Sequence, residues 1–346
     1  MATQARMRPS ELRLVEKIGQ LNWPLVVVVG LLGSVGYLVL YSAGGGSHEP
    51  WAWRHGIRLV FGFGVMLAVA LVDIRFWFRW AYVIYAVAFV MLVGVEVAEA
   101  LSKGAQRWID LGIVQLQPSE LMKVGLVLCL ARYFHGAYLD EVKRLFFLVI
   151  PLAAIALPAV LVLKQPDLGT SVMLIACGAT LLFLAGVRLW KFGVALGAVA
   201  AALPVVWASL HAYQRQRVLT FLDPETDPLG AGYHIIQSKI ALGSGGLWGK
   251  GFLQGSQAQL SFLPEKQTDF AFTMLAEETG FVGALVVLLL CLAVIGLGLV
   301  VALRCSHQFG RLLAMGIAFN FFLYVVINVA MVTGLIPVVG VPLPLI

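Results

Sequence analysis

The chain has 346 residues, of which 60% are hydrophobic and 12% are charged, whereas soluble domains average about 45–50% apolar and about 25% charged residues. This composition excludes an ordinary soluble globular protein and indicates an integral membrane protein. The formal net charge of +6 is typical of the Lys- and Arg-rich cytoplasmic loops of such proteins, so we expect no nucleic acid among its partners.

Nine stretches are apolar enough and long enough, at about 20 residues each, to cross a membrane as helices. In chain order they are roughly 22–42, 57–73, 80–98, 119–135, 145–163, 170–187, 192–210, 270–303 and 312–333. The eighth is too long for one straight span, so we expect it either to project beyond the bilayer or to be kinked near Gly280. The last apolar piece, 336–346, is rich in proline and too short to cross. The predicted fold class is an all-α, polytopic transmembrane helical bundle in a single domain, 1–346.

The basic residues of the short connections predict the orientation of the bundle. With residues 1–21 on the cytoplasmic side, most of these lysines and arginines lie inside, as the positive-inside rule requires. The long connection over 211–269 then lies outside. It carries many aromatic and branched apolar residues, which a disordered segment lacks, so we expect an ordered extracytoplasmic loop with a short helix over 232–242.

Acidic and basic residues interrupt or border the predicted spans, where charges are costly and usually functional. Glu120 and Lys123, spaced i and i+3, share one helix face and either line a polar cavity or only satisfy each other. Glu277 and Glu278 diverge by about 100° on a helix, so we expect one to face the bundle and the other the outer surface. Asp269, directly before the eighth span, is either a general base or cation ligand or a solvated helix cap.

The segment 243–257, GSGGLWGKGFLQGSQ, is rich in glycine and contains Lys250. It does not match the Walker A motif, because Ser244 and Gly251 stand where that motif needs Gly and Ser or Thr. Two interpretations remain open: backbone N–H groups that contact a phosphate, or simple tight turns. The four cysteines have neither CxxC nor zinc-ligand spacing, so we expect no disulfide and no cysteine metal site.

Several long motifs occur together in the chain. They are RWIDLGIVQLQPSELMK over 107–123, QPDLGTS over 165–171, FLDPETDPLGAGYHIIQSKIALGSGGLWGKG over 221–251, GSQAQLSFLPEKQTDFAFTMLAEETG over 255–280 and TGLIPVVGVPLPLI over 333–346. This set resembles the shape, elongation, division and sporulation (SEDS) family over nearly the whole chain after the first span. The closing PVVGVPLPLI is more similar to the RodA branch of that family than to the FtsW branch.

The resemblance implies a ten-span fold and a peptidoglycan glycosyltransferase that acts at the outer face of the bacterial inner membrane during cell elongation. The implied substrate is lipid II, a disaccharide-pentapeptide on undecaprenyl pyrophosphate, and the implied partner is a class B penicillin-binding protein that crosslinks the new strand. A divalent cation, Mg²⁺ or Mn²⁺, is an expected option as cofactor, with Asp269 as its ligand. The sequence ends at Ile346, before the SYGGS motif and the tenth span that the family usually has.

The family's site residues carry over one by one. The essential aspartate of the TDF motif falls on Asp269, the tryptophan of the RW-x-DLG motif on Trp108, and the polar pair of the PSE-x-x-K motif on Glu120 and Lys123. Gln267 stands where many members have histidine, so we expect no mechanism that needs an imidazole there. Further candidate contacts for the substrate or its cavity lie in the long loop: Lys239, Lys250 and Gln257.

Two other functions are open alternatives to the enzyme. A flippase that moves lipid II across the bilayer needs polar residues through the depth of the membrane. A non-catalytic scaffold of the elongation complex needs no positioned carboxylate. Because Glu120, Lys123 and Asp269 gather at the outer ends of the predicted spans, the sequence favours the enzyme.

Overall fold

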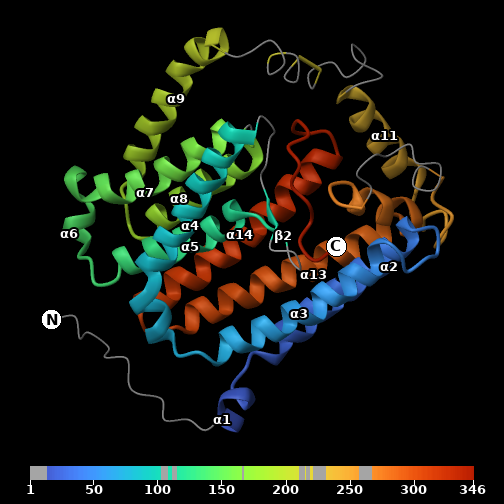
Figure 1. Cartoon of the computed structure of the whole chain (residues 1–346), viewed down its shortest axis with the longest axis horizontal. Coiled ribbons are helices and arrows are strands. Elements are labelled where there is room, and N and C mark those ends of the chain that lie inside the picture. Colours follow the sequence, from blue (N-terminus) through green and yellow to red (C-terminus); the bar gives the residue numbers. More distant parts are fainter. Residues whose placement is uncertain are drawn as a thin grey trace. The chain divides into compact units, whose positions relative to one another are not determined.

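The computed structural model describes residues 14–102, 108–110, 115–165, 167–209, 215, 219–220, 231–256 and 267–346 (Figure 1). The elements in these ranges are α-helices, as the sequence predicts, apart from a ribbon of two short antiparallel strands, β1 (Ile109–Asp110) and β2 (Gln115–Leu116). The helices in chain order are α1 (Leu14–Gly19), α2 (Trp23–Ala43), α3 (Trp51–Leu71), α4 (Ile74–Ser102), α5 (Pro118–Tyr133), α6 (Leu139–Val142), α7 (Leu145–Lys164), α8 (Leu168–Leu184), α9 (Leu189–Ser209), α11 (Ala231–Ser244), α13 (Ala271–Arg304) and α14 (Gln308–Val332). The helix expected over 232–242 is therefore observed as α11.

Six helices in the described part of the chain are long and apolar enough to cross a membrane: α2, α3, α4, α7, α13 and α14. The three other predicted spans correspond to α5, α8 and α9. α5 has 16 residues and α8 has 17, both short for a full span, and α9 has 21 residues with Pro204 inside it. The structure therefore confirms a polytopic helical membrane protein, whereas the count of nine spans stays a prediction.

The predicted starts of the second and third spans are wrong. α3 begins at Trp51 rather than near residue 57, and α4 begins at Ile74 rather than near residue 80, so only Val72 and Asp73 connect them. The first turns of α4 read IRFWFRW, and their arginines lower the hydropathy of this stretch. Arginine and aromatic side chains are nevertheless usual on helices at the membrane–water boundary. Hydropathy therefore detects the apolar centre of each helix and misses its amphipathic ends.

The chain folds as two compact units, each assembled from separate stretches of sequence. The first unit comprises Met1–Gln20, Leu71–Ala195 and Gly298–Asn320. The second comprises Leu21–Ala70, Leu196–Leu297 and Phe321–Ile346. Three helices, α9, α13 and α14, therefore contribute several residues to each unit, and α3 contributes its last residue, Leu71, to the first.

In the first unit, α4, α5, α7 and α8 pack against one another. Pro151 and Pro158 lie inside α7 and lack the N–H groups that would bond the carbonyls four residues earlier. A carbonyl left unpaired in a membrane costs several kcal/mol, and tyrosine hydroxyls from neighbouring helices bond both of them. The donors are Tyr133 to the Phe147 carbonyl at 2.8 Å and Tyr85 to the Ala154 carbonyl at 2.9 Å.

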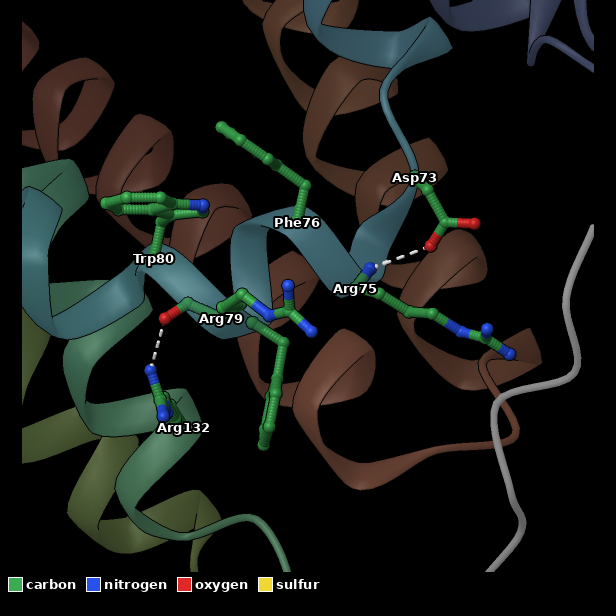
Figure 2. Close-up of a pocket in the computed structure, with 7 residues that line it drawn as sticks. Asp73, Arg75, Phe76, Arg79, Trp80 and Arg132 are labelled. Atoms are coloured by element: carbon green, nitrogen blue, oxygen red, sulfur yellow. Dashed lines mark hydrogen bonds between the residues drawn. The ribbon is translucent and has the colours of Figure 1, made fainter.

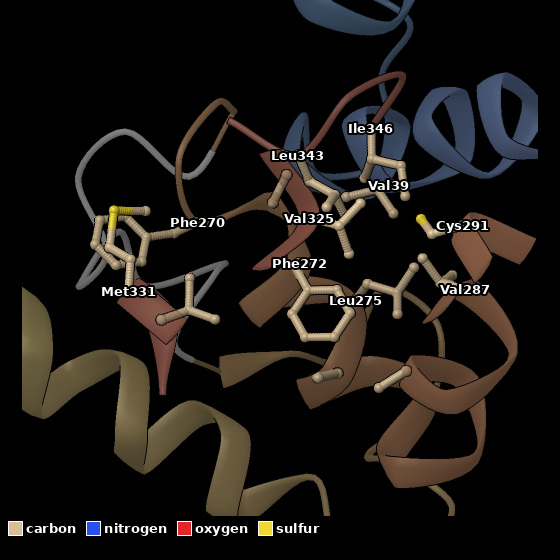
Figure 3. Close-up of a cluster of buried hydrophobic side chains, with 14 of the residues drawn as sticks. Val39, Phe270, Phe272, Leu275, Val287, Cys291, Val325, Met331, Leu343 and Ile346 are labelled. Atoms are coloured by element: carbon tan, nitrogen blue, oxygen red, sulfur yellow. The ribbon is translucent and has the colours of Figure 1, made fainter. Parts of the chain in front are cut away.

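In the second unit, a buried apolar core joins α2, the first part of α13, the last part of α14 and the C-terminal segment 336–346 (Figure 3). Leu343 and Ile346 of that segment are buried in it. On α2, a Cβ added to Gly36 would lie 2.1 Å from the Leu345 carbonyl oxygen, so only glycine permits this close approach. The proline-rich segment that was predicted not to cross the membrane is thus a non-helical part of the core.

α13 is broken at Gly280, whose φ of 69° and ψ of −167° are not helical, so the predicted kink is confirmed. A helix break leaves backbone N–H and C=O groups without their helical partners, and the connection that follows α11 bonds several of them. Two N–H groups of the connection donate to α13 carbonyls: Lys250 to Glu277 and Gly251 to Glu278, both at 3.0 Å. Two N–H groups beyond the break donate back: Phe281 to Gly246 at 2.9 Å and Val282 to Leu247 at 3.2 Å.

Glycine is required where the connection meets the break. A Cβ added to Gly249, which has a φ of 79°, would lie 2.1 Å from the Glu278 carbonyl oxygen, and one added to Gly280 would lie 2.3 Å from the Gly249 nitrogen. Gly249 therefore serves close backbone packing, as does Gly245, where an added Cβ would lie 2.3 Å from the Ala276 carbonyl oxygen. Because the N–H groups of Lys250 and Gly251 are already bonded within the protein, the structure favours the tight-turn interpretation over a phosphate loop.

Candidate functional site

Asp269 lies in the turn directly before α13 and is half-buried. Asn328 on α14 is fully buried, and its Nδ2 donates to the Asp269 carbonyl oxygen at 2.9 Å and to the Val341 carbonyl oxygen at 2.8 Å. A Cβ added to Gly340, which has a φ of 68°, would lie 3.6 Å from Asp269 Oδ2. The carboxylate thus borders the C-terminal segment, while its backbone is tied through one amide to both α14 and that segment.

Lys250 pairs with a buried carboxylate of the broken helix. Glu277 Oε1 accepts a hydrogen bond from Lys250 Nζ at 2.6 Å and one from Ser256 Oγ at 3.1 Å, and Lys250 Nζ also donates to Ser256 Oγ at 2.7 Å. The Glu277 side chain is 0% exposed and the Lys250 side chain is 28% exposed. The charge of Lys250 is therefore balanced inside the protein, and its contact with substrate stays a prediction.

The expectation that one of the two adjacent glutamates faces the outer surface is wrong, because Glu277 and Glu278 are both buried. Glu278 Oε1 accepts a short hydrogen bond from the Ser42 hydroxyl of α2. A Cβ added to Gly255 would lie 3.1 Å from Glu277 Oε2 and 3.2 Å from Glu278 Cγ. A helical wheel of α13 alone leaves one of these two glutamates facing outward, but the glycine-rich connection covers that side of the helix.

Glu120 and Lys123 form the ion pair that their spacing predicts, with 2.7 Å between Lys123 Nζ and Glu120 Oε1. The pair is asymmetric, because the Lys123 side chain is 1% exposed and the Glu120 side chain is 46% exposed. Asp167, whose Oδ1 accepts the Thr170 N–H at the start of α8 at 3.1 Å, also interacts electrostatically with Lys123. The buried ammonium group of Lys123 therefore interacts with two carboxylates, those of Glu120 and Asp167, whereas the sequence predicts only the pair with Glu120.

The remaining predicted contacts are distributed over both units. Trp108 is exposed and directly precedes β1. Lys239 is exposed on α11, and its stem lies against Gly334, where an added Cβ would come within 2.3 Å of Lys239 Cε. Gln257 lies outside the described residues. The first unit contains Trp108, Glu120 and Lys123, and the second contains Lys239, Lys250 and Asp269.

Sequence reasoning missed three residues that interact with the residues described above: Asn328, Asp167 and Ser42. Asn328 had a detectable signal, because an amide inside the apolar run 321–332 is costly unless it is bonded. Asp167 lies within the QPDLGTS motif, but nothing in the sequence connects it to Lys123. Ser42 had no signal, because a serine at the end of an apolar helix is ordinary.

The described residues contain no group of three or more His, Cys, Asp or Glu side chains that could hold a metal ion. A divalent cation at Asp269 would therefore have at most two protein ligands of these kinds among the described residues. That is compatible with Mg²⁺, which usually binds one or two carboxylates and takes its other ligands from substrate phosphates and water.

Comparison with known proteins extends to nearly the whole chain. Residues 21–346 match the family model FTSW_RODA_SPOVE, described as cell cycle protein. The chain is 48% identical over 310 residues to peptidoglycan glycosyltransferase MrdB of Escherichia coli strain K12, a match that covers 89% of this chain and 83% of that protein. It is similar to a solved structure described as "Structural coordination of polymerization and crosslinking by a peptidoglycan synthase complex", with a TM-score of 0.80 and 31% identity over 94% of this chain and 90% of that one. It is also similar to the crystal structure of the rod shape determining protein RodA of Thermus thermophilus, with a TM-score of 0.68 and 26% identity over 94% and 89% of the two chains. A match of this extent and identity shows that the chain belongs to the FtsW/RodA/SpoVE family.

Proposed function

We propose that this chain is a peptidoglycan glycosyltransferase of the RodA branch, which polymerises lipid II into glycan strands at the outer face of the inner membrane during cell elongation. The observation that carries the proposal is the setting of Asp269. It is a half-buried carboxylate at the start of α13, with its backbone tied down by the buried Asn328. The similarity to MrdB, which is named a peptidoglycan glycosyltransferase, supports the reaction type.

The reaction needs a base at the acceptor sugar. Polymerisation joins a donor sugar, which leaves its pyrophosphate, to an acceptor hydroxyl, which loses its proton. A carboxylate within hydrogen-bond reach of that hydroxyl contributes about 10²–10⁴-fold to the rate. Asp269 suits this role because its side chain is partly open to a substrate while its backbone is fixed.

The leaving pyrophosphate needs positive charge. Lys250 is already paired with Glu277, so Lys239 is the better candidate among the predicted loop lysines, since its ammonium group has no hydrogen-bond or ion-pair partner within the described residues. A divalent cation, Mg²⁺ or Mn²⁺, held by Asp269 and the phosphates would supply the same neutralisation. The two sources of charge are distinguished by whether EDTA abolishes polymerisation.

The proposal includes a partner and a topology. Glycan strands have to be crosslinked, so a class B penicillin-binding protein is the expected partner, and the similar structure described as coordinating polymerization and crosslinking supports this expectation. Nine spans, with residues 1–21 in the cytoplasm and the loop 211–269 outside, bring Asp269 to the outer face. Membrane lipids then surround the apolar helices and hold the lipid tail of the substrate.

The test is lipid II polymerisation by purified protein with substitutions at Asp269. Asp269→Asn keeps the size of the side chain and loses its basicity, and Asp269→Glu moves the carboxylate by about 1 Å, which can cost on the order of 10²-fold. We expect both variants to lose at least about 10²-fold in rate while folding normally. Asp140→Asn, in an exposed pair with Lys143, is the matched control and should polymerise normally. A near wild-type rate for Asp269→Asn would remove Asp269 from the mechanism and reopen the flippase and scaffold alternatives.

A further inference from the structure

A basic pocket lies at the start of α4 in the first unit, and none of the candidate site residues lines it. It has a volume of about 570 Å³, and Figure 2 shows its lining residues coming from the first turns of α4 and from the end of α5. Pockets of about 300–1,000 Å³ are of the size that holds small ligands. The lining residues are Asp73, Arg75, Phe76, Phe78, Arg79, Trp80 and Arg132.

The lining of the pocket has a net positive charge. Three arginines and one aspartate give its lining a formal charge of +2. Asp73 Oδ1 accepts the backbone N–H of Arg75 at 2.8 Å, which occupies part of its carboxylate in capping α4. Within the described part of the chain, the guanidinium groups of Arg75 and Arg79 have neither a hydrogen bond nor a salt bridge. Two charged donor groups are therefore available at one cavity.

The third arginine is a fixed part of the wall. Arg132 Nη1 donates to the Arg79 carbonyl oxygen at 2.6 Å, and its guanidinium lies 4.3 Å from the ring centroid of Tyr82 and 5.1 Å from that of Phe78. These contacts hold α5 against α4 and keep one positive charge in place. These contacts of Arg132 preorganise the pocket and leave the guanidinium groups of Arg75 and Arg79 available to a ligand.

The residues around the pocket are of the kinds found at the boundary between membrane and water. The apolar span of α4 begins at Ile74, so five of the lining residues, Arg75 to Trp80 without Trp77, occupy its first turns. Phe76 and Trp80 in the wall are 48% and 44% exposed, and aromatic residues so placed are typical of the level of the lipid head groups. Arginine stems and aromatic rings offer apolar contact beside the charges. A ligand with one anionic group and an attached apolar chain fits both properties.

We propose that this pocket binds the phosphodiester head group of an anionic phospholipid of the phosphatidylglycerol class. The planar guanidinium groups of Arg75 and Arg79 match phosphate oxygens in paired hydrogen bonds, and basic pockets between membrane helices are known to take such head groups. The exposed rings of Phe76 and Trp80 face the glycerol and the first methylenes of the acyl chains. With residues 1–21 in the cytoplasm, as proposed above, the bound lipid belongs to the inner leaflet.

The test measures lipid retained by the purified full chain with native mass spectrometry, after titration with phosphatidylglycerol or phosphatidylethanolamine in detergent. The test variant is Arg75→Gln with Arg79→Gln. The control is Arg188→Gln with Arg304→Gln, which removes the same charge from exposed arginines outside the pocket. We expect the test variant to bind phosphatidylglycerol at least 10-fold more weakly than wild type, the control to be within 2-fold of wild type, and phosphatidylethanolamine to be held weakly by all three.

Two further arms keep the result decisive. Inorganic phosphate at millimolar concentration should fail to displace phosphatidylglycerol from the wild type, because it lacks the apolar chain; full displacement would make this a site for free phosphate and overturn the lipid assignment. If the double variant does not fold, the single Arg75→Gln variant replaces it, since the Arg75 side chain makes no hydrogen bond in the described structure. Equal phosphatidylglycerol binding by wild type and by either folded variant, or an equal loss in the control, overturns the proposal.

Discussion

Replacement of Lys250 by methionine removes the ammonium group that faces Glu277 and keeps the length of the side chain. Glu277 is 0% exposed, so its carboxylate then has a buried charge without its cation. Breaking a buried pair in this way costs about 3–5 kcal/mol. Because the Lys250 side chain is 28% exposed, water reaches one side of the pair, and we expect a loss near the lower end, about 3 kcal/mol.

The reverse change is expected to be milder. Glu277→Gln leaves the lysine charged, but Lys250 can turn its ammonium group into water, so the loss should be about 1–2 kcal/mol. The double variant lacks both charges and should be more stable than the sum of the two losses predicts, by about 1–3 kcal/mol of coupling.

The assay is unfolding of the purified protein in detergent, followed by circular dichroism for the two single variants, the double variant and the wild type. The pair Asp140–Lys143 provides the control cycle, because it has the same charges at an exposed site, where ion pairs contribute little. The reasoning is that the unpaired buried carboxylate causes most of the loss in stability. Strictly additive losses in the free energy of unfolding at Lys250 and Glu277, or a Glu277→Gln variant less stable than Lys250→Met, would refute it.

The remaining predictions concern three other places in the molecule. Glu120→Gln should cost less stability than Lys123→Met, because Glu120 is the more exposed partner and its loss leaves Lys123 with the second carboxylate at Asp167; equal losses in an unfolding assay contradict this. Asn328→Leu should lower kcat for lipid II polymerisation by about 10-fold or more with little change in KM, because it frees the Asp269 backbone and can shift the carboxylate by about 1 Å; an unchanged kcat would show that this tether is only structural. Cys305 lies in the connection between α13 and α14, which the proposed orientation puts in the cytoplasm, so an impermeant maleimide should react with it only in opened cells; labelling of intact cells would reverse that orientation. Because burial raises the pKa of this thiol, the labelling rate should go on rising with pH above a thiol's usual pKa range of about 8–9.

Much of the fold follows from the sequence for simple physical reasons. Apolar runs of this length cannot be solvated by water, and in lipid every backbone group needs an internal partner, which leaves helices as the solution for such runs. The break at Gly280 was foreseeable because the eighth run is too long for one span and glycine adopts non-helical backbone angles easily. The ion pair of Glu120 and Lys123 was foreseeable because residues three apart on a helix are neighbours.

Other features depend on which segments meet in space. The sequence of α7 shows that Pro151 and Pro158 free two carbonyls, but not that tyrosines of α5 and α4 bond them. Helix ends were misjudged where arginines and aromatics extend a helix beyond its apolar centre.

The features of the candidate site also fall into those that follow from the sequence and those that depend on the tertiary structure. The sequence by itself determined the class of protein and the local pair on α5, and the family motif marks Asp269 as the candidate carboxylate. Only the tertiary structure decided that Asn328 holds the Asp269 backbone, that Lys250 belongs to Glu277, and that Glu278 is buried against Ser42, a partner 236 residues away. A helical wheel describes one element, whereas burial and pairing of a charge depend on the surfaces that other elements bring to it.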